Sequence, residues 1–107
     1  GWKRVFRVEL AAPGATMTKT PYLDLMAMTD PDLLAPALPG DVGVGLQPDG
    51  SRTPAYAFPY ITPETLVPLG ANRLLLINDN NLPFSMGRHV GSHAADDTEW
   101  IVVEVGP

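Results

Sequence analysis

The sequence lacks cysteine, long apolar runs and an excess of basic side chains. Without cysteine, neither a disulfide framework nor a thiolate metal site can form. No stretch of about eighteen apolar residues occurs, so we expect no membrane span. The chain has 7 Lys and Arg against 12 Asp and Glu, a formal charge of −5. This balance argues against nucleic acid as a partner, because phosphates require a basic surface.

Proline and glycine are abundant instead. The 107 residues include 12 Pro and 10 Gly, which predict many turns and few long helices. A hydrophobic content of 45% and a charged content of 18% are typical of a folded chain. A chain of this length forms at most one domain, and a domain this small is of modest stability.

The apolar pattern predicts a mainly β chain. Residues 2–10 alternate between apolar and charged side chains, the period of a half-buried strand. Residues 64–69 and 73–78 read as two strands joined by a tight turn, and residues 99–105 as a further strand. The exception is residues 24–35, where we expect one or two short helical turns, with Thr29 or Asp30 capping a second turn that starts at Pro31.

Residues 78–81, with the sequence NDNN, follow the second strand of the expected hairpin. Carboxylate and amide oxygens are the ligands that calcium prefers, so Asn78, Asp79 and Asn81 are candidate metal ligands. The spacing does not match that of a helix–loop–helix calcium loop. Asn and Asp are also common in turns, where they bond the neighbouring backbone. The local pattern leaves both interpretations open.

A second acidic group, Asp96, Asp97 and Glu99, stands immediately before the last expected strand. Three carboxylates this close repel one another unless they are solvated, hydrogen-bonded or neutralised by a cation. If the intervening loop folds back, they could meet Asp79 and hold a metal or perform acid–base catalysis. A solvated turn before an edge strand is the alternative.

The loop between these groups has the sequence SMGRHVGSH. Arg88 is a candidate phosphate-binding residue, because a guanidinium contacts phosphate oxygens in a two-pronged manner. We assign His89 to substrate binding beside it, and either His89 or His93 could transfer a proton near neutral pH. Their spacing matches a helical zinc pair, but Gly87 and Gly91 argue against a helix here.

Glu64 begins the first strand of the hairpin, just after Pro63. It could face inward as a ligand or a catalytic base, or it could simply cap the turn. No Gly-x-Ser-x-Gly nucleophile motif is present, so the sequence gives no support for a serine triad.

Residues 58–105 resemble the C-terminal end of the phytase-like family, whose proteins carry the esterase-like-activity-of-phytase domain. The family ends in a similar order of aromatic-Pro strand, Glu-led strand, Asn-Asp-Asn-Asn, Gly/Arg loop, acidic group and final strand. The residues that match are Glu64, residues 78–81, Gly87, Arg88, Asp96, Asp97 and Glu99. The segment LDLMAMTDPDLLA also resembles an Asp-Pro segment of the family, and the match over residues 1–57 is weaker.

This resemblance implies a β-propeller-like fold in a periplasmic or secreted protein. It also implies a phosphoester or phosphodiester hydrolase activity that rests on Asp and Glu side chains, although the sequence leaves open whether this chain is an enzyme. In that interpretation Glu64, Asp96, Asp97 and Glu99 are catalytic, and calcium polarises the phosphoryl oxygen. The alternative is a non-catalytic propeller module for binding or assembly, with a structural calcium loop.

The chain is short for such a fold. A propeller needs at least four blades of roughly forty residues, and 107 residues supply about two. The chain also opens with GWKRV and no Met. We therefore expect residues 1–107 to be a single partial domain, a fragment that the remaining part of the same propeller or a partner chain completes.

Overall fold

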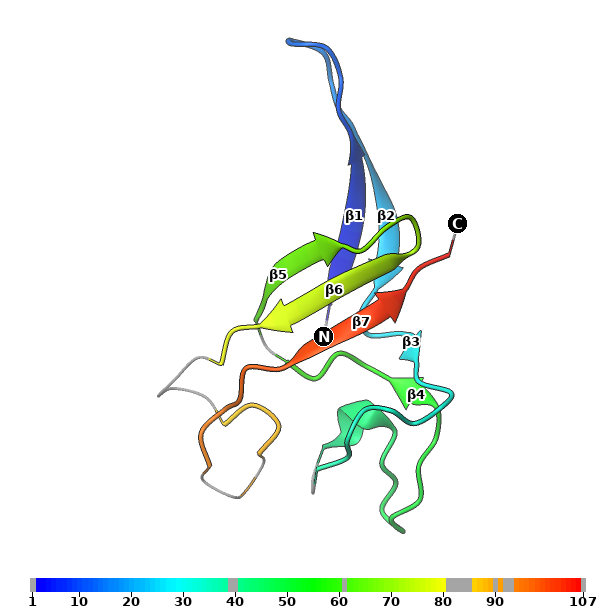
Figure 1. The fold of residues 1–107 in the computed structure, drawn as a ribbon, viewed down its shortest axis with the longest axis vertical. Helices are drawn as coiled ribbons and strands as arrows, with labels where there is room; N and C mark the ends of the chain where they lie inside the picture. Colours follow the sequence, from blue (N-terminus) through cyan, green and yellow to red (C-terminus); the bar gives the residue numbers. More distant parts are fainter. Residues whose placement is uncertain are drawn as a thin grey trace.

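The structure is a computed structural model that describes residues 2–38, 41–60, 62–80, 86–89, 91 and 94–106. It is mainly β, as the sequence predicts, with three small antiparallel sheets. Figure 1 shows the order of the elements along the chain. They are β1 (Arg4–Glu9), β2 (Thr18–Asp24), β3 (Met28–Thr29), the 3-10 turn η1 (Val42–Val44), β4 (Ala55–Tyr56), β5 (Pro63–Pro68), β6 (Arg73–Asn78) and β7 (Trp100–Glu104).

Strands β5, β6 and β7 form a three-stranded antiparallel sheet in that order. The predicted hairpin and the predicted final strand are both confirmed. The turn between β5 and β6 closes through a hydrogen bond from Leu69 N to Arg73 O, at 2.8 Å, with Gly70 at a φ of 81°. Along β6 buried and less buried side chains alternate, so that Leu74 and Leu76 face inward. Residues opposite one another share a face, which places Ile101 and Val103 on the inner face as well.

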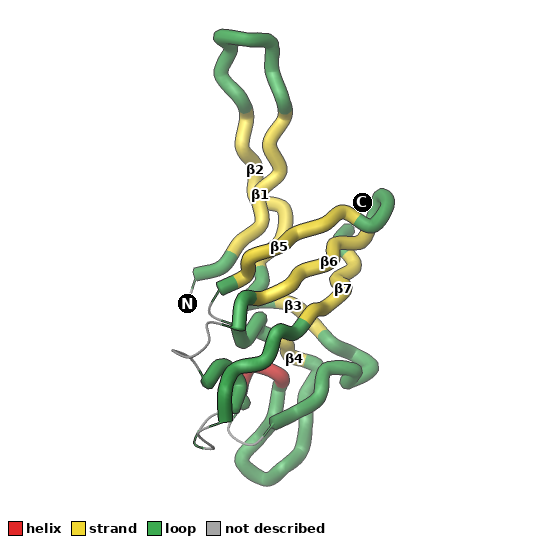
Figure 2. Tube along the Cα trace, turned by 60° about the vertical axis from the view of Figure 1, so that its left-hand side comes forward, coloured by secondary structure: helices red, strands yellow, loops and turns green. Residues whose placement is uncertain are grey.

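Strands β1 and β2 form an arm that extends away from the rest of the molecule (Figures 1 and 2). We use the name arm for residues 4–24. The strand predicted near residues 2–10 is confirmed, but its half-burial is not, since the side chains of Val8 and Leu10 are 45% and 90% exposed. At the base of the arm, Leu25 N donates to Lys3 O at 3.0 Å, and Lys3 Nζ donates to Phe58 O at 2.8 Å.

The helical segment expected over residues 24–35 is wrong. A turn follows Asp24, and then β3 pairs with β4 through the register Met28↔Tyr56 and Thr29↔Ala55. Asp30 does cap a turn, because its carboxylate accepts from Leu34 N and Ala35 N at 2.9 Å each. Leu33 adopts a φ of 53°, which is not helical, so the turn does not continue. Pairing with a segment distant in sequence outweighs the local helical preference.

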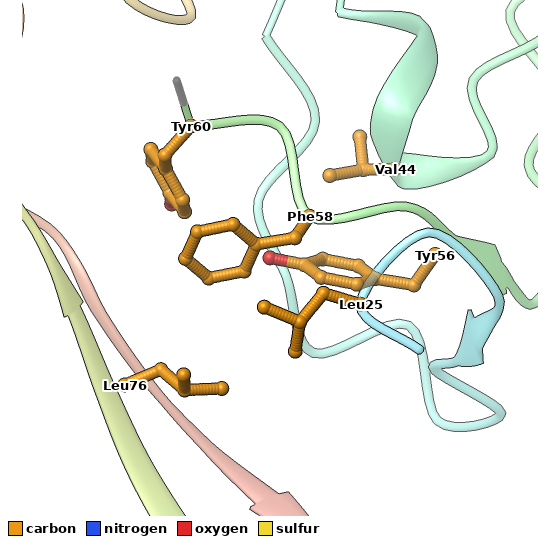
Figure 3. Packing of buried hydrophobic residues seen from close by; sticks show 6 residues of the cluster. All are labelled: Leu25, Val44, Tyr56, Phe58, Tyr60 and Leu76. Atoms are coloured by element: carbon orange, nitrogen blue, oxygen red, sulfur yellow. The ribbon is translucent and has the colours of Figure 1, made fainter. Parts of the chain in front are cut away.

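The hydrophobic core lies between the inner face of the sheet and the segments around η1 and β4. Figure 3 shows its six buried members, which are Leu25, Val44, Tyr56, Phe58, Tyr60 and Leu76. Phe58 and Tyr60 pack edge to face, with ring centroids 4.8 Å apart. Partly buried Ile101 and Val103 of β7 pack against this cluster. The core therefore joins the sheet to the irregular segments that carry the polar loop.

The molecule is extended for its size. Its radius of gyration is 16.0 Å and its extents are 52 × 32 × 23 Å, whereas a compact chain of this length has a radius of about 13 Å. The sheets have two, two and three strands, so no four-stranded blade is present in the described part of the chain. Within those residues, no helix is long and apolar enough to cross a membrane.

We expect Leu76→Ala to lower the free energy of unfolding by about 2–5 kcal/mol, because it leaves a cavity beneath Phe58. Urea unfolding followed by circular dichroism measures this loss. Leu66→Ala is the matched control: Leu66 lies opposite Leu76 on the same face of the sheet but is 46% exposed. It should cost only about 0.5 kcal/mol. Equal losses in the two variants would contradict this account of the core.

Candidate functional site

The centre of the polar loop is the buried side chain of Arg88, which is 3% exposed. Its Nε donates to Asp41 Oδ2 and its Nη2 donates to the carbonyl oxygen of Pro36. Its Nη1 donates to Glu99 Oε2 at 2.7 Å and to the Tyr60 hydroxyl at 3.4 Å. A buried guanidinium is tolerated only when its charge and its N–H groups are satisfied in this way. One side chain thus joins three other segments of the chain: residues 36–41, Tyr60 and Glu99.

The pKa values follow from this burial. Burial alone would lower the pKa of Arg88, but the hydrogen bond with Asp41 and the nearby negative charge outweigh it and raise the pKa above its ordinary value. Burial also raises the pKa of the Tyr60 hydroxyl, and the hydrogen bond to Glu99 adds to the effect. For Tyr56, burial raises the pKa to about 12. The site thus keeps the guanidinium charged and both phenols neutral at neutral pH.

Asp41 is the partner that sequence reasoning missed. It precedes η1, and its Oδ1 accepts from Gly43 N at 3.0 Å, so one carboxylate both caps η1 and pairs with Arg88. A side chain at Gly43 would approach Ala57 O to 2.8 Å, which explains the glycine. The signal in the sequence was the Asp-x-Gly of GDVG, which is typical of a cap. Nothing in the sequence linked it to Arg88, which is 47 positions away.

Asn78 ends β6 and connects it to the segment before β7. Its side-chain nitrogen donates to Asp97 O at 3.0 Å and to Asp79 O at 3.2 Å. Its Oδ1 accepts from Glu99 N at 2.6 Å. Asp79 N in turn donates to Thr62 O at 2.9 Å. Only the bond to Asp79 O is the local turn bond that we weighed against a metal site; the bonds to Asp97 and Glu99 join segments about 20 positions apart.

A metal site in this loop stays a prediction. Asn81, the third candidate calcium ligand, lies outside the described residues, and so does His93. Within the part of the chain that the structure describes, no group of three or more Asp, Glu or His side chains is arranged to hold a metal ion.

Asp97 lies beside His89, with Asp97 Oδ2 2.7 Å from His89 Nε2. The imidazole is one-quarter exposed and the carboxylate is mostly exposed. The backbone N–H of His89 donates to Met86 O at 2.8 Å, which orients the ring from a tight turn. A carboxylate that holds one nitrogen of an accessible imidazole is an arrangement that suits proton transfer.

Asp96 and Glu64 have different surroundings. Asp96 is 7% exposed and packs against Gly87, which has a φ of 49°. A Cβ at Gly87 would overlap the Asp96 carboxylate, so only glycine fits this position. Glu64 is exposed at an irregularity in β5, between the paired residues Pro63 and Thr65. The side chain of Glu64 makes no hydrogen bond or ion pair with any other described residue.

The structure therefore brings some of the predicted residues together. Arg88 pairs with Glu99, His89 pairs with Asp97, and Asn78 bonds the backbone of Asp97 and Glu99. Phosphate binding by Arg88 stays a prediction, and it would require displacement of at least one present partner of the guanidinium. Comparison of the sequence with protein-family models, with curated proteins and with solved structures found no match.

We expect Arg88→Ala to lower the free energy of unfolding by about 3–5 kcal/mol, because it leaves the buried carboxylate of Asp41 without its counter-charge. The double variant Arg88→Met with Asp41→Asn removes both charges and should lose less than Arg88→Ala alone. The exposed Arg7→Ala is the control and should change the value by about 0.5 kcal/mol. Denaturant unfolding measures all three. A loss below about 1 kcal/mol for Arg88→Ala would show that the contacts of Arg88 with Asp41 and Glu99 do not stabilise the fold.

We expect the stability to fall as the pH rises from about 10 to about 12. Tyr56 has its pKa raised from 10.0 to about 12, so below pH 10 the phenol is neutral in both states and its contribution is fully present. Above pH 10 Tyr56 ionises only in the unfolded state, which by itself lowers stability by about 1.4 kcal/mol per pH unit, and Tyr60, whose pKa is also raised, adds to the slope. Unfolding at a series of pH values measures the slope. Tyr56→Phe should reduce it, and Tyr22→Phe, at the surface, should not.

Proposed function

We propose that this chain is a non-catalytic part of a larger β-propeller-like assembly. The observation that carries the proposal is the outer face of the three-stranded sheet. Apolar side chains lie at its centre on all three strands, with Thr65, Arg73 and Glu104 toward its ends; the apolar ones are Val67, Leu75, Ile77, Trp100 and Val102. The most exposed of them, Trp100 and Val102, are 67% and 45% exposed.

A sheet with two apolar faces needs cover on both. The inner face has its core, yet even there Leu66 of β5 is 46% exposed although it lies opposite the buried Leu76. All six residues of β5 are exposed. Contiguous exposed apolar surface of this kind is typical of an interaction site. The chain thus has the surface properties of a sheet that further β-structure covers.

The polar loop fits this role. The polar atoms of Arg88 and Asn78 form hydrogen bonds between separate segments of the chain, so both side chains have a structural role. Calcium bound by Asn78, Asp79 and Asn81 would then hold the loop between β6 and β7 and would take no part in catalysis. The completing part would be the rest of the same propeller or a separate chain.

A second candidate is phosphoester or phosphodiester hydrolysis, and the pair of His89 and Asp97 favours it. In this candidate His89 acts as the general base on water while Asp97 orients its imidazole. Glu99, Asp96 and the more distant Glu64 would hold the cation or act as acid and base, and Arg88 would bind phosphate. We rank it second because Arg88 already has protein partners at Nε, Nη1 and Nη2.

We expect sedimentation velocity to show larger species as the protein concentration rises, because association removes the apolar outer face of the sheet from water. Val102→Lys should weaken this association on the order of tenfold, since a charge on a buried interface is costly. Ala71→Lys, in the exposed turn between β5 and β6, is the matched control and should leave the association unchanged.

Hydrolysis of bis(p-nitrophenyl) phosphate distinguishes the two candidates. We expect no turnover with or without calcium, and no difference between the natural chain and His89→Ala. A strictly monomeric chain with calcium-dependent turnover that His89→Ala abolishes would overturn the proposal in favour of the hydrolase.

A further inference from the structure

β7 is one of the two edge strands of the sheet, with β5 at the opposite edge, and among the described residues it pairs with β6 alone. Asn78 N donates to Glu99 O, and Val105 N donates to Asn72 O, at the two ends of the β6–β7 ladder. In an antiparallel pair the hydrogen-bonded positions alternate, so residues 99, 101, 103 and 105 direct their backbone toward β6. The backbone groups of Trp100, Val102 and Glu104 therefore point outward from the sheet.

A groove of about 850 Å³ runs along this edge. One wall is β7 and the other is formed by residues 27–32 and 34–36, which follow β2 in the chain. Figure 1 shows β7 with β3 beyond its free edge. A five-residue strand is about 17 Å long. A row of outward backbone groups beside an open groove is the surface on which an extended strand adds to a sheet.

Acidic side chains outnumber basic ones in the lining of the groove, with Asp30, Asp32, Glu99 and Glu104 against Arg73 and Arg88. Asp32 on one wall and Glu104 on the other are exposed and form no ion pair with any described residue. Asp30 and Glu99 also line the groove but are engaged by Arg52 and Arg88. The occupant that fits is thus an extended strand with apolar and basic side chains.

The arm of this chain is an extended segment that carries apolar and basic side chains. Residues 4–24 hold three of the seven basic residues and two of the twelve acidic ones, a formal charge of +1, which leaves −6 on the rest of the chain. Arg7 and Lys19 lie on the exposed part of the arm beside the exposed Val8. The arm is a two-stranded sheet, so neither of its outer edges pairs with another strand of the described residues. β2 contains Pro21, which has no amide hydrogen, whereas β1 contains no proline.

We propose that the arm of a second copy of this chain docks in the groove along β7, with its β1 edge pairing with the free edge of β7. This inference rests on the proposed function and names the partner that supplies cover. The pairing joins the two sheets into one and sets the basic arm against Asp32 and Glu104. Two copies can exchange arms reciprocally in a closed dimer, or each can pass its arm to the next copy.

The test is cross-linking between single-cysteine variants, because the natural chain has no cysteine. Val8→Cys protein is mixed with isotope-labelled Val102→Cys protein and treated with a short bis-maleimide. Val8 and Val102 are each 45% exposed, and Leu66→Cys, at 46%, replaces Val102→Cys as the matched control on β5. We expect the Val8–Val102 product to exceed the Val8–Leu66 product at least tenfold in mass spectra.

Two variants test the charge argument by sedimentation. Arg7→Glu should raise the dissociation constant of the self-association about fivefold, whereas Arg7→Lys, which keeps the charge, should leave it within twofold.

Association that persists with equal cross-linking to β5 and β7 would overturn the arm-in-groove contact and leave the proposed assembly function intact. A dissociation constant that Arg7→Glu does not change would overturn the electrostatic contact between the arm and the groove, and would also leave the proposed assembly function intact. A chain that stays monomeric at all concentrations would overturn both proposals.

Discussion

The fold depends on the buried guanidinium of Arg88. Tyr56, Phe58 and Tyr60 form a core of modest size, and most of the chain around it is irregular. Arg88 ties the segment before β7 to η1, through Asp41, and to Pro36. Because a buried charge is strongly destabilising when unpaired, the Arg88 partners constrain one another's positions. The sheet and the loops are therefore held in one arrangement by a polar interaction that complements the small core.

Short-range pattern in the sequence was enough to predict the sheet. The β5–β6 hairpin and β7 follow from alternation and from turn residues within a few positions of each other. The helix expected over residues 24–35 failed because β3 pairs with β4, a contact across 25 or more positions. The pairing of Arg88 with Asp41 was invisible for the same reason. Asn78 was weighed as either a ligand or a turn residue, and neither interpretation anticipated that its side chain bonds the backbone of Asp97 and Glu99, about 20 positions away.

The hydrogen bonds of Arg88 and Asn78 also affect the exposed edge and outer face of the three-stranded sheet. By fixing the segment before β7, the Arg88 and Asn78 contacts leave β7 at the edge of the sheet with its outward backbone groups accessible. Trp100 and Val102 then lie on an apolar face that the chain itself does not cover. A chain with an ordered interior and an uncovered sheet is stabilised further by association with more β-structure.

Hydrogen exchange along β7 tests this account most directly, with the strand as its own control. In dilute protein, the amides of Ile101 and Val103 should be protected by β6, whereas those of Trp100, Val102 and Glu104 should exchange rapidly. At concentrations where the protein associates, the account predicts that the three outward amides become protected while the inward ones change little. Outward amides that stay unprotected in the associated protein would contradict strand addition at this edge.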